Sequence, residues 1–230
     1  MTVGRAIVLA DGDQPSRVDL DAAWPGWADG VDLVIAADGG ARLADPLGLR
    51  IDAWVGDGDS LGEAGLGELR RAGVPITLAP ADKDESDAEM GLLAALRTGA
   101  RDVTILGSLG GPRLDHALAN VALLAHPAAS GAAVRLLDGA TRIRLLAAPG
   151  LNGGPARLDL AGRVGDLVSL IPLDDVAGVS TAGLRYPLRD EALPAGPARG
   201  LSNVRQRASA DVTIRRGRLL VVEVPATLPE

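Results

Sequence analysis

Two aspartates in a turn of small residues are the first candidates for chemistry. Asp57 and Asp59 lie two residues apart, directly after a short apolar run that contains Trp54. Two like charges about 4 Å apart repel by ~1 kcal/mol in water and by ~4 kcal/mol at an effective dielectric of about 20, and a bound cation relieves this repulsion. Carboxylate oxygens suit Mg²⁺, which proteins hold through one or two carboxylates together with substrate phosphates. The simpler interpretation is a solvated turn in which Asp59 or Ser60 caps the next helix.

A second acidic segment spans residues 82–87 and contains Lys83, the only lysine among 23 basic residues. Asp84 and Asp87 belong to the same segment. If parallel strands bring this segment beside Asp57, the lysine suits a phosphate contact, because a compact ammonium acts as a point charge where an arginine presents a broad fork. The alternative is that these acids only favour the positive end of the following helix, and that the lysine has survived there by chance.

Turns that contain glycine supply a third kind of candidate. Asp38 precedes a pair of glycines, the first of which is Gly39. Residues without a side chain let the backbone approach a ligand closely. Further along the chain, glycines precede Arg113 and Asp115, and Asn120 follows one turn along the predicted helix. We expect Arg113 to clamp a polyphosphate, and Asp115 to hold either that arginine or a ribose hydroxyl.

The composition argues against several classes of protein. The chain has no cysteine, which excludes disulfide frameworks, thiolate metal sites and cysteine nucleophiles. It has neither a GxxxxGK motif followed by Ser or Thr nor a GxGxxG motif in the first βα turn, which argues against a P-loop enzyme and against dinucleotide redox chemistry. His116 has no visible triad partners, so it is expected to pack or to cap a helix. A net charge of -7 argues against a nucleic-acid surface.

The elements that must position these residues follow from hydrophobic periodicity. Apolar runs predict strands at 6–10, 31–37, 53–56, 76–79, 102–107 and 133–137. Helical spacing predicts helices at 62–72, 86–98 and 114–125, and Ser86 is the expected N-cap of the second helix. This alternation is typical of an α/β domain with a parallel sheet. The polar segments then follow the carboxyl ends of strands, where parallel-sheet proteins place their sites.

The pattern changes after about residue 141, where alternating segments broken by Gly, Pro and Asp replace the helical periodicity. We therefore expect an N-terminal α/β domain over residues 1–140 and a C-terminal all-β sandwich domain over 141–230. The pair Arg216 and Gly217 suggests a hairpin turn between the last two strands. The apolar run at 219–222 is far shorter than the ~20 residues of a membrane span. Together with the absence of cysteine and of a secretory signal pattern, this favours a cytoplasmic protein.

Four segments, taken in order, resemble the motif series of the thiamine pyrophosphokinase family. They are ADGGARL at 37–43, VGDGDSL at 55–61, DKDESDAEMGL at 82–92 and GGPRLDHALAN at 110–120. The second domain agrees, because its segments resemble the thiamine-binding β domain of that family: ATRIRLL at 140–146, GLRYPL at 183–188 and RGLSNV at 199–204. The resemblance covers nearly the whole chain, and its specificity comes from the order and spacing of the motifs.

The resemblance implies a transferase of the kinase type that requires Mg²⁺ and uses ATP as co-substrate. The hydroxyl of thiamine would attack the β-phosphorus of ATP, giving thiamine diphosphate and AMP. It also implies a homodimer whose active site lies between the α/β domain of one subunit and the β domain of the other.

Residue roles follow from the same resemblance. Asp57, Asp59 and Asp87 match the catalytic and metal-binding carboxylates, and Ser202 and Asn203 match the serine and asparagine near the vitamin. The residues expected to bind ATP or its metal are Asp38, Gly39, Lys83, Asp84, Arg113, Asp115 and Asn120.

Three residues depart from the family pattern, and other functions fit parts of the sequence. Gly58, Pro112 and Val204 stand where a larger apolar residue, a second glycine and an acid are common, which leaves the shape of their loops open. A pyrophosphokinase acting on a pterin alcohol would use the same ATP and Mg²⁺ apparatus. A nucleotide-sugar glycosyltransferase would leave the Lys83 segment unexplained, and a non-catalytic nucleotide sensor would have no need of so many carboxylates.

Overall fold

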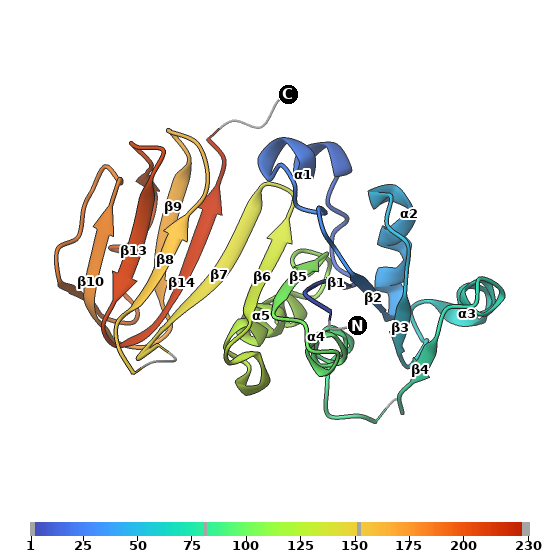
Figure 1. Ribbon diagram of the computed structural model, residues 1–230. Coiled ribbons are helices and arrows are strands. Elements are labelled where there is room, and N and C mark those ends of the chain that lie inside the picture. Colours follow the sequence, from blue (N-terminus) through green and yellow to red (C-terminus); the bar gives the residue numbers. More distant parts are fainter. Residues whose placement is uncertain (1–2, 81, 151–152, 227–230) are drawn as a thin grey trace. The chain divides into compact units, whose positions relative to one another are not determined.

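The computed structural model describes residues 3–80, 82–150 and 153–226. By its internal contacts the chain divides into two compact units, Met1–Gly139 and Ala140–Glu230 (Figure 1). The first unit alternates strands and helices, and the second contains strands joined by turns. This is the α/β unit followed by an all-β unit that the periodicity predicts.

The first unit is built on a parallel sheet with the strand order β6-β5-β1-β2-β3-β4. The strands are β1 (Arg5–Leu9), β2 (Leu33–Ala37), β3 (Ala53–Gly56), β4 (Ile76–Leu78), β5 (Asp102–Leu106) and β6 (Ala133–Asp138). All but the edge strand β4 are nearly continuous apolar runs, as expected for strands covered on both faces. Each predicted strand is present within two residues of its expected ends.

Helices connect these strands. They are α1 (Arg17–Ala23), η1 (Asp38–Leu43), α2 (Ala44–Leu47), α3 (Gly62–Arg71), α4 (Asp87–Arg97), α5 (Leu114–Ala122), η2 (Leu123–Ala125) and η3 (Pro127–Ala129). Ser86 caps α4 as expected, since its hydroxyl accepts a hydrogen bond from the Glu89 amide at 3.2 Å. Helix α4 packs so closely on β1 that a Cβ at Gly91 would lie 2.6 Å from Val8 Cγ1. The predicted helix at 114–125 ends at Ala122 and continues as a tighter 3-10 turn.

The order of the strands explains where a site can form. The chain adds β2, β3 and β4 on one side of β1, and then crosses to add β5 and β6 on the other side. The loops after the neighbouring strands β1 and β5 therefore leave the sheet in different directions. Ligands of open α/β sheets bind in the crevice between two such loops, where the order of the strands reverses. Figure 1 shows these strands side by side, with α3 at the outer edge beyond β3 and β4.

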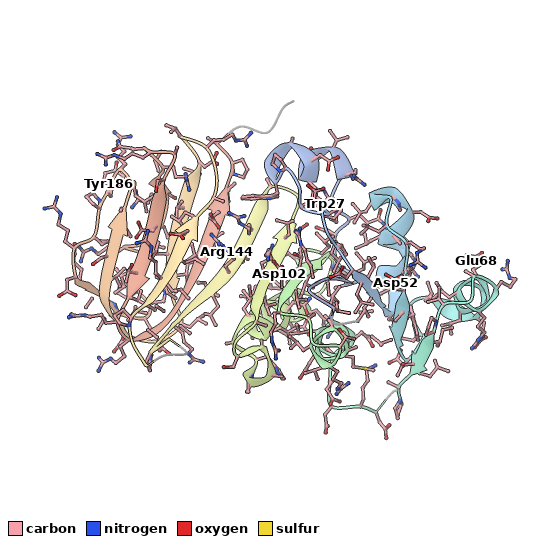
Figure 2. The ribbon with its side chains drawn as sticks, viewed as in Figure 1. Trp27, Asp52, Glu68, Asp102, Arg144 and Tyr186 are labelled. Carbon is pink, nitrogen blue, oxygen red and sulfur yellow. The ribbon has the colours of Figure 1, made fainter. Side chains whose placement is uncertain are left out.

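The second unit is a sandwich of two antiparallel sheets, one with the order β12-β9-β14-β7 and the other β11-β10-β13-β8. The strands are β7 (Thr141–Ala148), β8 (Ala156–Leu160), β9 (Leu167–Pro172), β10 (Val176–Ala182), β11 (Glu191–Leu193), β12 (Asn203–Val204), β13 (Ala210–Ile214) and β14 (Gly217–Val224). Inward residues from both sheets, such as Val168, Val179 and Val212, form one buried core. On β14, buried Glu223 pairs with Arg142 and Arg144 of β7. Arg144 is labelled in Figure 2.

The predicted hairpin at Arg216 and Gly217 is wrong. Strand β13 pairs with β8 and β10, whereas β14 pairs with β7 and β9, so the turn carries the chain from one sheet of the sandwich to the other. Arg216 forms an isolated bridge with Ala177, and Gly217 has a φ of 98°. Alternation of side chains identifies a strand but does not select its partner, which explains the error.

No helix among the described residues is long and apolar enough to cross a membrane.

Candidate active site

Loops after β1, β2, β3, β4 and β5 line a cavity of about 570 Å³ in the first unit. All five loops follow the carboxyl ends of parallel strands, which places their polar side chains at one edge of the sheet. The predicted site residues that line the cavity are Asp38, Asp57, Asp59, Lys83, Asp87, Arg113 and Asn120. The topology thus gathers residues that are spread over more than a third of the sequence.

Three carboxylates form the centre of this cavity. Asp38, Asp57 and Asp59 each offer an oxygen, and these oxygens lie within 4.8 Å of one another. The expected metal set contained Asp87 rather than Asp38. In the structure Asp87 lines the same cavity at the start of α4, but it stands outside this close trio.

Asp38 is the buried member of the trio, with 2% of its surface exposed. Its carboxylate accepts hydrogen bonds from the amides of Ser60 and Leu61 at 3.1 and 3.2 Å, and its carbonyl accepts one from the indole of Trp54 at 3.0 Å. Its φ of 42° is unusual for a residue with a side chain. Burial raises the pKa of Asp38, and the nearby carboxylates of Asp59 and Asp87 raise it further against the effect of the two amides.

Lys83 stands between two of the acids. Its Nζ lies 2.8 Å from Asp57 Oδ2 and 2.9 Å from Asp87 Oδ1, and its side chain is only 10% exposed. Hydrogen bonding from Lys83 holds the pKa of Asp57 below its usual value. Burial lowers the pKa of Lys83, but its two carboxylate partners outweigh this effect and raise it. The lysine therefore stays charged and neutralises part of the acidic cavity.

Arg113 lies at the exposed rim of the cavity and pairs with Asp115, with Nη2 2.6 Å from Oδ2. This bidentate pair lowers the pKa of Asp115 and raises that of Arg113. Asp115 and Asp84 are themselves exposed and stand outside the cavity wall that the described residues form. Asp115 is thus placed to orient Arg113 from outside the cavity.

Asn120 is buried and donates from Nδ2 to the carbonyl of Ser108 at 2.8 Å. Its hydrogen bond fixes the start of the glycine-containing loop, so this residue shapes the cavity wall.

Glycines allow the loops under the cavity to pack backbone against backbone. A Cβ at Gly12 would lie 2.5 Å from the carbonyl oxygen of Gly107, and one at Gly39 would lie 2.1 Å from Asp11 Oδ2. Gly39 therefore serves the site by admitting the Asp11 carboxylate. Asp11 lines the cavity and pairs with Arg42 at 3.3 Å, and the sequence reasoning missed it. Its signal was the same as at Asp57: an acid directly after an apolar strand.

The departure at Gly58 has a local cause. Gly58 has a φ of 85°, and a Cβ there would lie 2.9 Å from Leu66 Cδ1, so a side chain would be both strained and crowded. Pro112 lines the cavity, and Val204 lies in β12 of the second unit.

The two predicted vitamin-site residues belong to the second unit. Asn203 lines a pocket of about 180 Å³ there, together with residues that follow β10. Its side chain is engaged with the loop itself, because Oδ1 accepts from the Tyr186 amide at 3.0 Å and Nδ2 donates to the Tyr186 carbonyl at 2.7 Å. Ser202 has a φ of 55°, and its amide donates to Ser169 Oγ at 3.0 Å.

Two family models match the chain, one in each unit. Residues 27–136 match the family model described as "Thiamin pyrophosphokinase, catalytic domain", and residues 157–219 match "Thiamin pyrophosphokinase, vitamin B1 binding domain". A curated relative, thiamine pyrophosphokinase of Bacillus subtilis, is 26% identical over 200 residues, covering 86% of this chain and 89% of the relative.

Solved structures align with nearly the whole chain. The crystal structure of thiamine pyrophosphokinase from Bacillus subtilis aligns with a TM-score of 0.78 at 24% identity, covering 96% of this chain and 99% of the other. The thiamin pyrophosphokinase structure from Geobacillus thermodenitrificans aligns with a TM-score of 0.74 at 26% identity, covering 96% of each chain.

Proposed function

The chain belongs to the thiamine pyrophosphokinase family and transfers pyrophosphate from ATP to thiamine, and we propose that the acidic cavity of the first unit is where this transfer takes place. The observation that carries the proposal is the convergence of Asp38, Asp57 and Asp59 in a cavity that Lys83 also lines. In the reaction, the thiamine hydroxyl oxygen bonds to the β-phosphorus of ATP. The bond from that phosphorus to the oxygen of AMP breaks, AMP leaves with the electron pair, and the proton of the thiamine hydroxyl is released to the solvent.

The carboxylates of the cavity fit a divalent cation. Their oxygens approach within 4.8 Å of one another, and like charges so close are unfavourable without a positive partner. We propose that Asp57, Asp59 and Asp87 hold Mg²⁺, with Asp38 added to the set that the sequence suggests. When bound, the ion supplies positive charge to phosphate oxygens that gain charge in the transition state.

Two basic side chains of this chain are suited to hold the phosphates. Lys83 offers a compact charge deep in the cavity, and Arg113 offers a two-pronged contact at the rim. Asp115 keeps the guanidinium of Arg113 oriented, and Asn120 fixes the loop that carries it. We propose that these residues align the β-phosphorus with the incoming hydroxyl, which lowers the barrier chiefly through positioning and charge.

We also propose a homodimer that works in the cytoplasm, where each β unit supplies the vitamin pocket for the α/β unit of its partner. The support is that the acidic cavity and the pocket at Asn203 belong to separate compact units. Pterin and sensor functions are not favoured, because the second unit matches a vitamin B1 binding model.

Incubation of the protein with ATP, thiamine and Mg²⁺, followed by identification of the nucleotide product, tests the reaction. We expect AMP and thiamine diphosphate in equal amounts, and no turnover after Mg²⁺ is chelated. ADP as the product, or AMP release that does not depend on thiamine, would contradict the proposed chemistry. Turnover that persists in the chelated protein would contradict the metal assignment.

Subunit mixing tests the shared site. Arg113→Ala weakens the nucleotide half, and the combination of Ser202→Ala with Asn203→Ala weakens the vitamin half. If the two halves meet across a dimer, mixed dimers contain one composite site without either substitution, and the mixture should regain activity. Mixing that restores nothing, although native mass spectrometry shows heterodimers, would count against the shared site.

A further inference from the structure

Arg42 joins three loops of the first unit. It lies in the 3-10 helix η1, which follows β2, and its side chain is 49% exposed. One terminal nitrogen, Nη1, lies 3.3 Å from Asp11 Oδ1 in the loop after β1. The other, Nη2, donates a hydrogen bond to the carbonyl of Ser60 in the loop after β3. A single guanidinium thus holds the loops that follow β1 and β3 to the element that follows β2.

The side chain of Arg42 stands behind the acidic cavity. The described residues that line this cavity include both of its partners, Asp11 and Ser60, but not Arg42 itself. Arg42 instead lines a separate cavity of about 690 Å³, whose wall also contains residues of α2 and α3. In this position its guanidinium does not meet a phosphate bound in the acidic cavity, as we propose for Arg113. Any part that Arg42 plays in the reaction must therefore pass through the residues that it holds.

The peptide between Ser60 and Leu61 is held from both sides. Its carbonyl accepts the hydrogen bond from Arg42, and its amide, that of Leu61, donates to Asp38 Oδ1 at 3.2 Å. The carbonyl and the amide of a trans peptide point in opposite directions, so the two bonds oppose one another. Asp38 and Arg42 belong to the same short element, η1. The peptide is therefore fixed relative to η1.

The segment that ends at this peptide carries two of the three carboxylates at the centre of the cavity. Ser60 Oγ donates to Asp59 Oδ1 at 3.2 Å, and the amide of Asp59 donates to Asp57 Oδ1 at 3.1 Å. These bonds tie Asp57 and Asp59 to the segment that Arg42 holds. How closely they approach Asp38 thus depends on where Arg42 keeps the Ser60 carbonyl.

The geometry of Arg42 suits positioning better than stabilisation. The ion pair between Arg42 and Asp11 is exposed at both ends, and such pairs contribute little to stability because water screens their charges. An arginine, however, presents its donors in a planar fork of fixed directions, which a lysine ammonium does not. Arg42 uses the two ends of this fork on two different loops.

We propose, on the basis of the proposed function, that Arg42 is a positioning residue for the metal site: it holds the Ser60 peptide so that Asp57 and Asp59 are gathered before an ion binds. Arg42 itself contacts neither the ion nor the substrates. The sign of its effect is informative. If Arg42 supplied only positive charge near the acidic cavity, its removal would strengthen cation binding. As a positioning residue, its removal weakens cation binding, because the ligands are no longer held in place.

A titration of the full-length protein with Mn²⁺, in the absence of substrates, tests this sign. Electron paramagnetic resonance measures the free Mn²⁺. Arg42→Gln should raise the Kd for Mn²⁺ about tenfold, and Arg42→Lys, which keeps the charge but serves only one of the two loops, should raise it about threefold. A Kd in Arg42→Gln that equals the parental value or falls below it would overturn the proposal.

Arg50→Gln is the matched control for this titration. Arg50 lines the same 690 Å³ cavity as Arg42 and also pairs with an acid, but that acid, Asp52, lies before the start of β3, at the opposite end of the strand from the site. The control should keep the parental Kd. Loss of Mn²⁺ affinity in Arg50→Gln equal to that in Arg42→Gln would overturn the assignment to Arg42.

Hydrogen exchange tests the positioning without any metal. In the apo protein, loss of the bond from Arg42 should free the peptide between Ser60 and Leu61 to move. We expect the Leu61 amide to exchange about tenfold faster in Arg42→Gln, and the amides of the core strand β1 to keep their parental rates. An unchanged rate at Leu61 would overturn the proposal, whatever the activity of the protein.

Kinetics separate positioning from catalysis. Arg42→Gln should raise the free Mg²⁺ needed for half-maximal rate about tenfold, and kcat at saturating Mg²⁺ should stay within about twofold of the parental value, because high Mg²⁺ compensates for the weaker site. A large loss of kcat that saturating Mg²⁺ does not restore would make Arg42 a catalytic residue and overturn the proposal. If the parent makes AMP from thiamine and ATP, and Arg42→Gln shows the parental dependence on Mg²⁺, the positioning role is overturned while the enzymatic function stands.

Discussion

In the first unit, three carboxylates face one another across the cavity, and Lys83 neutralises only some of the acids around it. In the second unit, the polar atoms of Asn203 are taken up by the backbone of the loop that it joins. A bound cation can thus relieve the repulsion among the carboxylates of the cavity. The polar atoms of Asn203, in contrast, already have hydrogen-bond partners in the protein without a ligand. Removal of an acid that Lys83 does not contact, such as Asp59, and removal of Asn203 should therefore have opposite consequences for stability.

The largest expected effect is on catalysis at the centre of the cavity. Asp57→Asn and Asp59→Asn should each lower kcat by at least ~10³-fold, because each removes a charged oxygen ligand. Their apo proteins should differ: Asp57 accepts a hydrogen bond from Lys83, so its loss lowers the Tm, whereas loss of Asp59 relieves repulsion and leaves the Tm level or higher. Initial rates at saturating Mg²⁺ and thermal unfolding without metal measure the two properties.

A matched control for these variants is Asp45→Asn, an exposed acid on α2 that lies outside the cavity. It should leave the rate unchanged. Near-parental activity in Asp57→Asn or Asp59→Asn would remove that residue from the metal set.

In the second unit, Asn203→Ala should lower the free energy of unfolding by about 2–3 kcal/mol, since three hydrogen bonds are lost at roughly 1 kcal/mol net each. Ser202→Gly should instead raise it by up to about 1 kcal/mol, because glycine adopts a φ of 55° without strain. Urea unfolding of both variants measures these differences. An Asn203→Ala protein with the parental free energy of unfolding would contradict the proposed difference between the hydrogen-bonded Asn203 loop and the cavity, in which like charges repel.

Lys83→Met should destabilise the apo protein by about 2 kcal/mol, because Asp57 and Asp87 lose the cation between them. Saturating Mg²⁺ should restore more stability to this variant than it adds to the parent. In the parent, the lowered pKa of Asp57 means that the pair stabilises the fold above the ordinary aspartate range, and that this contribution is lost as pH falls through the lowered value. The variant should lack that acid-side loss, which unfolding curves between pH 2 and about pH 7 would reveal. If Lys83→Met were as stable as the parent at neutral pH, the lysine would not be the counter-ion of the cavity.

The smallest expected effect concerns Asp138 at the end of β6, where burial and the nearby charge of Asp13 raise the pKa to about 6. A raised pKa means that ionisation costs stability as pH rises from about 4 through 6, and that no cost exists below this range. Asp138→Asn should therefore be more stable than the parent by about 1 kcal/mol at pH 8 and equal to it at low pH, because water screens a partly exposed carboxylate. Asp102→Asn, which removes the partner of Arg135, should change stability in the opposite direction at pH 8. Equal pH profiles for Asp138→Asn and the parent would contradict this account.

The sequence predicts the strands of the first unit and its helices α3, α4 and α5 well, because their apolar periodicity is strong, whereas it led to no prediction of α1, of α2 or of the order of the strands in the sheet. Strand 53–56 has the predicted ends, and α4 differs from its prediction by one residue at each end. The partner of a strand is harder to predict, as β13 and β14 demonstrate: alternation is the same whether the next strand lies in the same sheet or in the facing one.

The detailed arrangement of side chains could be predicted only in part. The spacing of the motifs led to Asp57 and Lys83. The approach of Asp38 to Asp57 and Asp59 depends on a backbone conformation with positive φ, for which an aspartate gives little signal. The commitment of Asn203 to Tyr186 depends on two segments 17 residues apart meeting across a loop. Such contacts arise from tertiary structure, and the local sequence does not encode them.

The backbone-to-backbone packing at Gly12 and Gly39 has a consequence for laboratory evolution of this protein. Neither glycine needs to touch a ligand, yet any side chain at either position would collide with a neighbouring loop or with Asp11. Libraries that vary these loops one residue at a time should return inactive, poorly folded clones at both positions. New donor preferences would have to be sought at the rim around Arg113, where the residues are exposed, or by exchanging the loops after β1, β2 and β5 together as a single block.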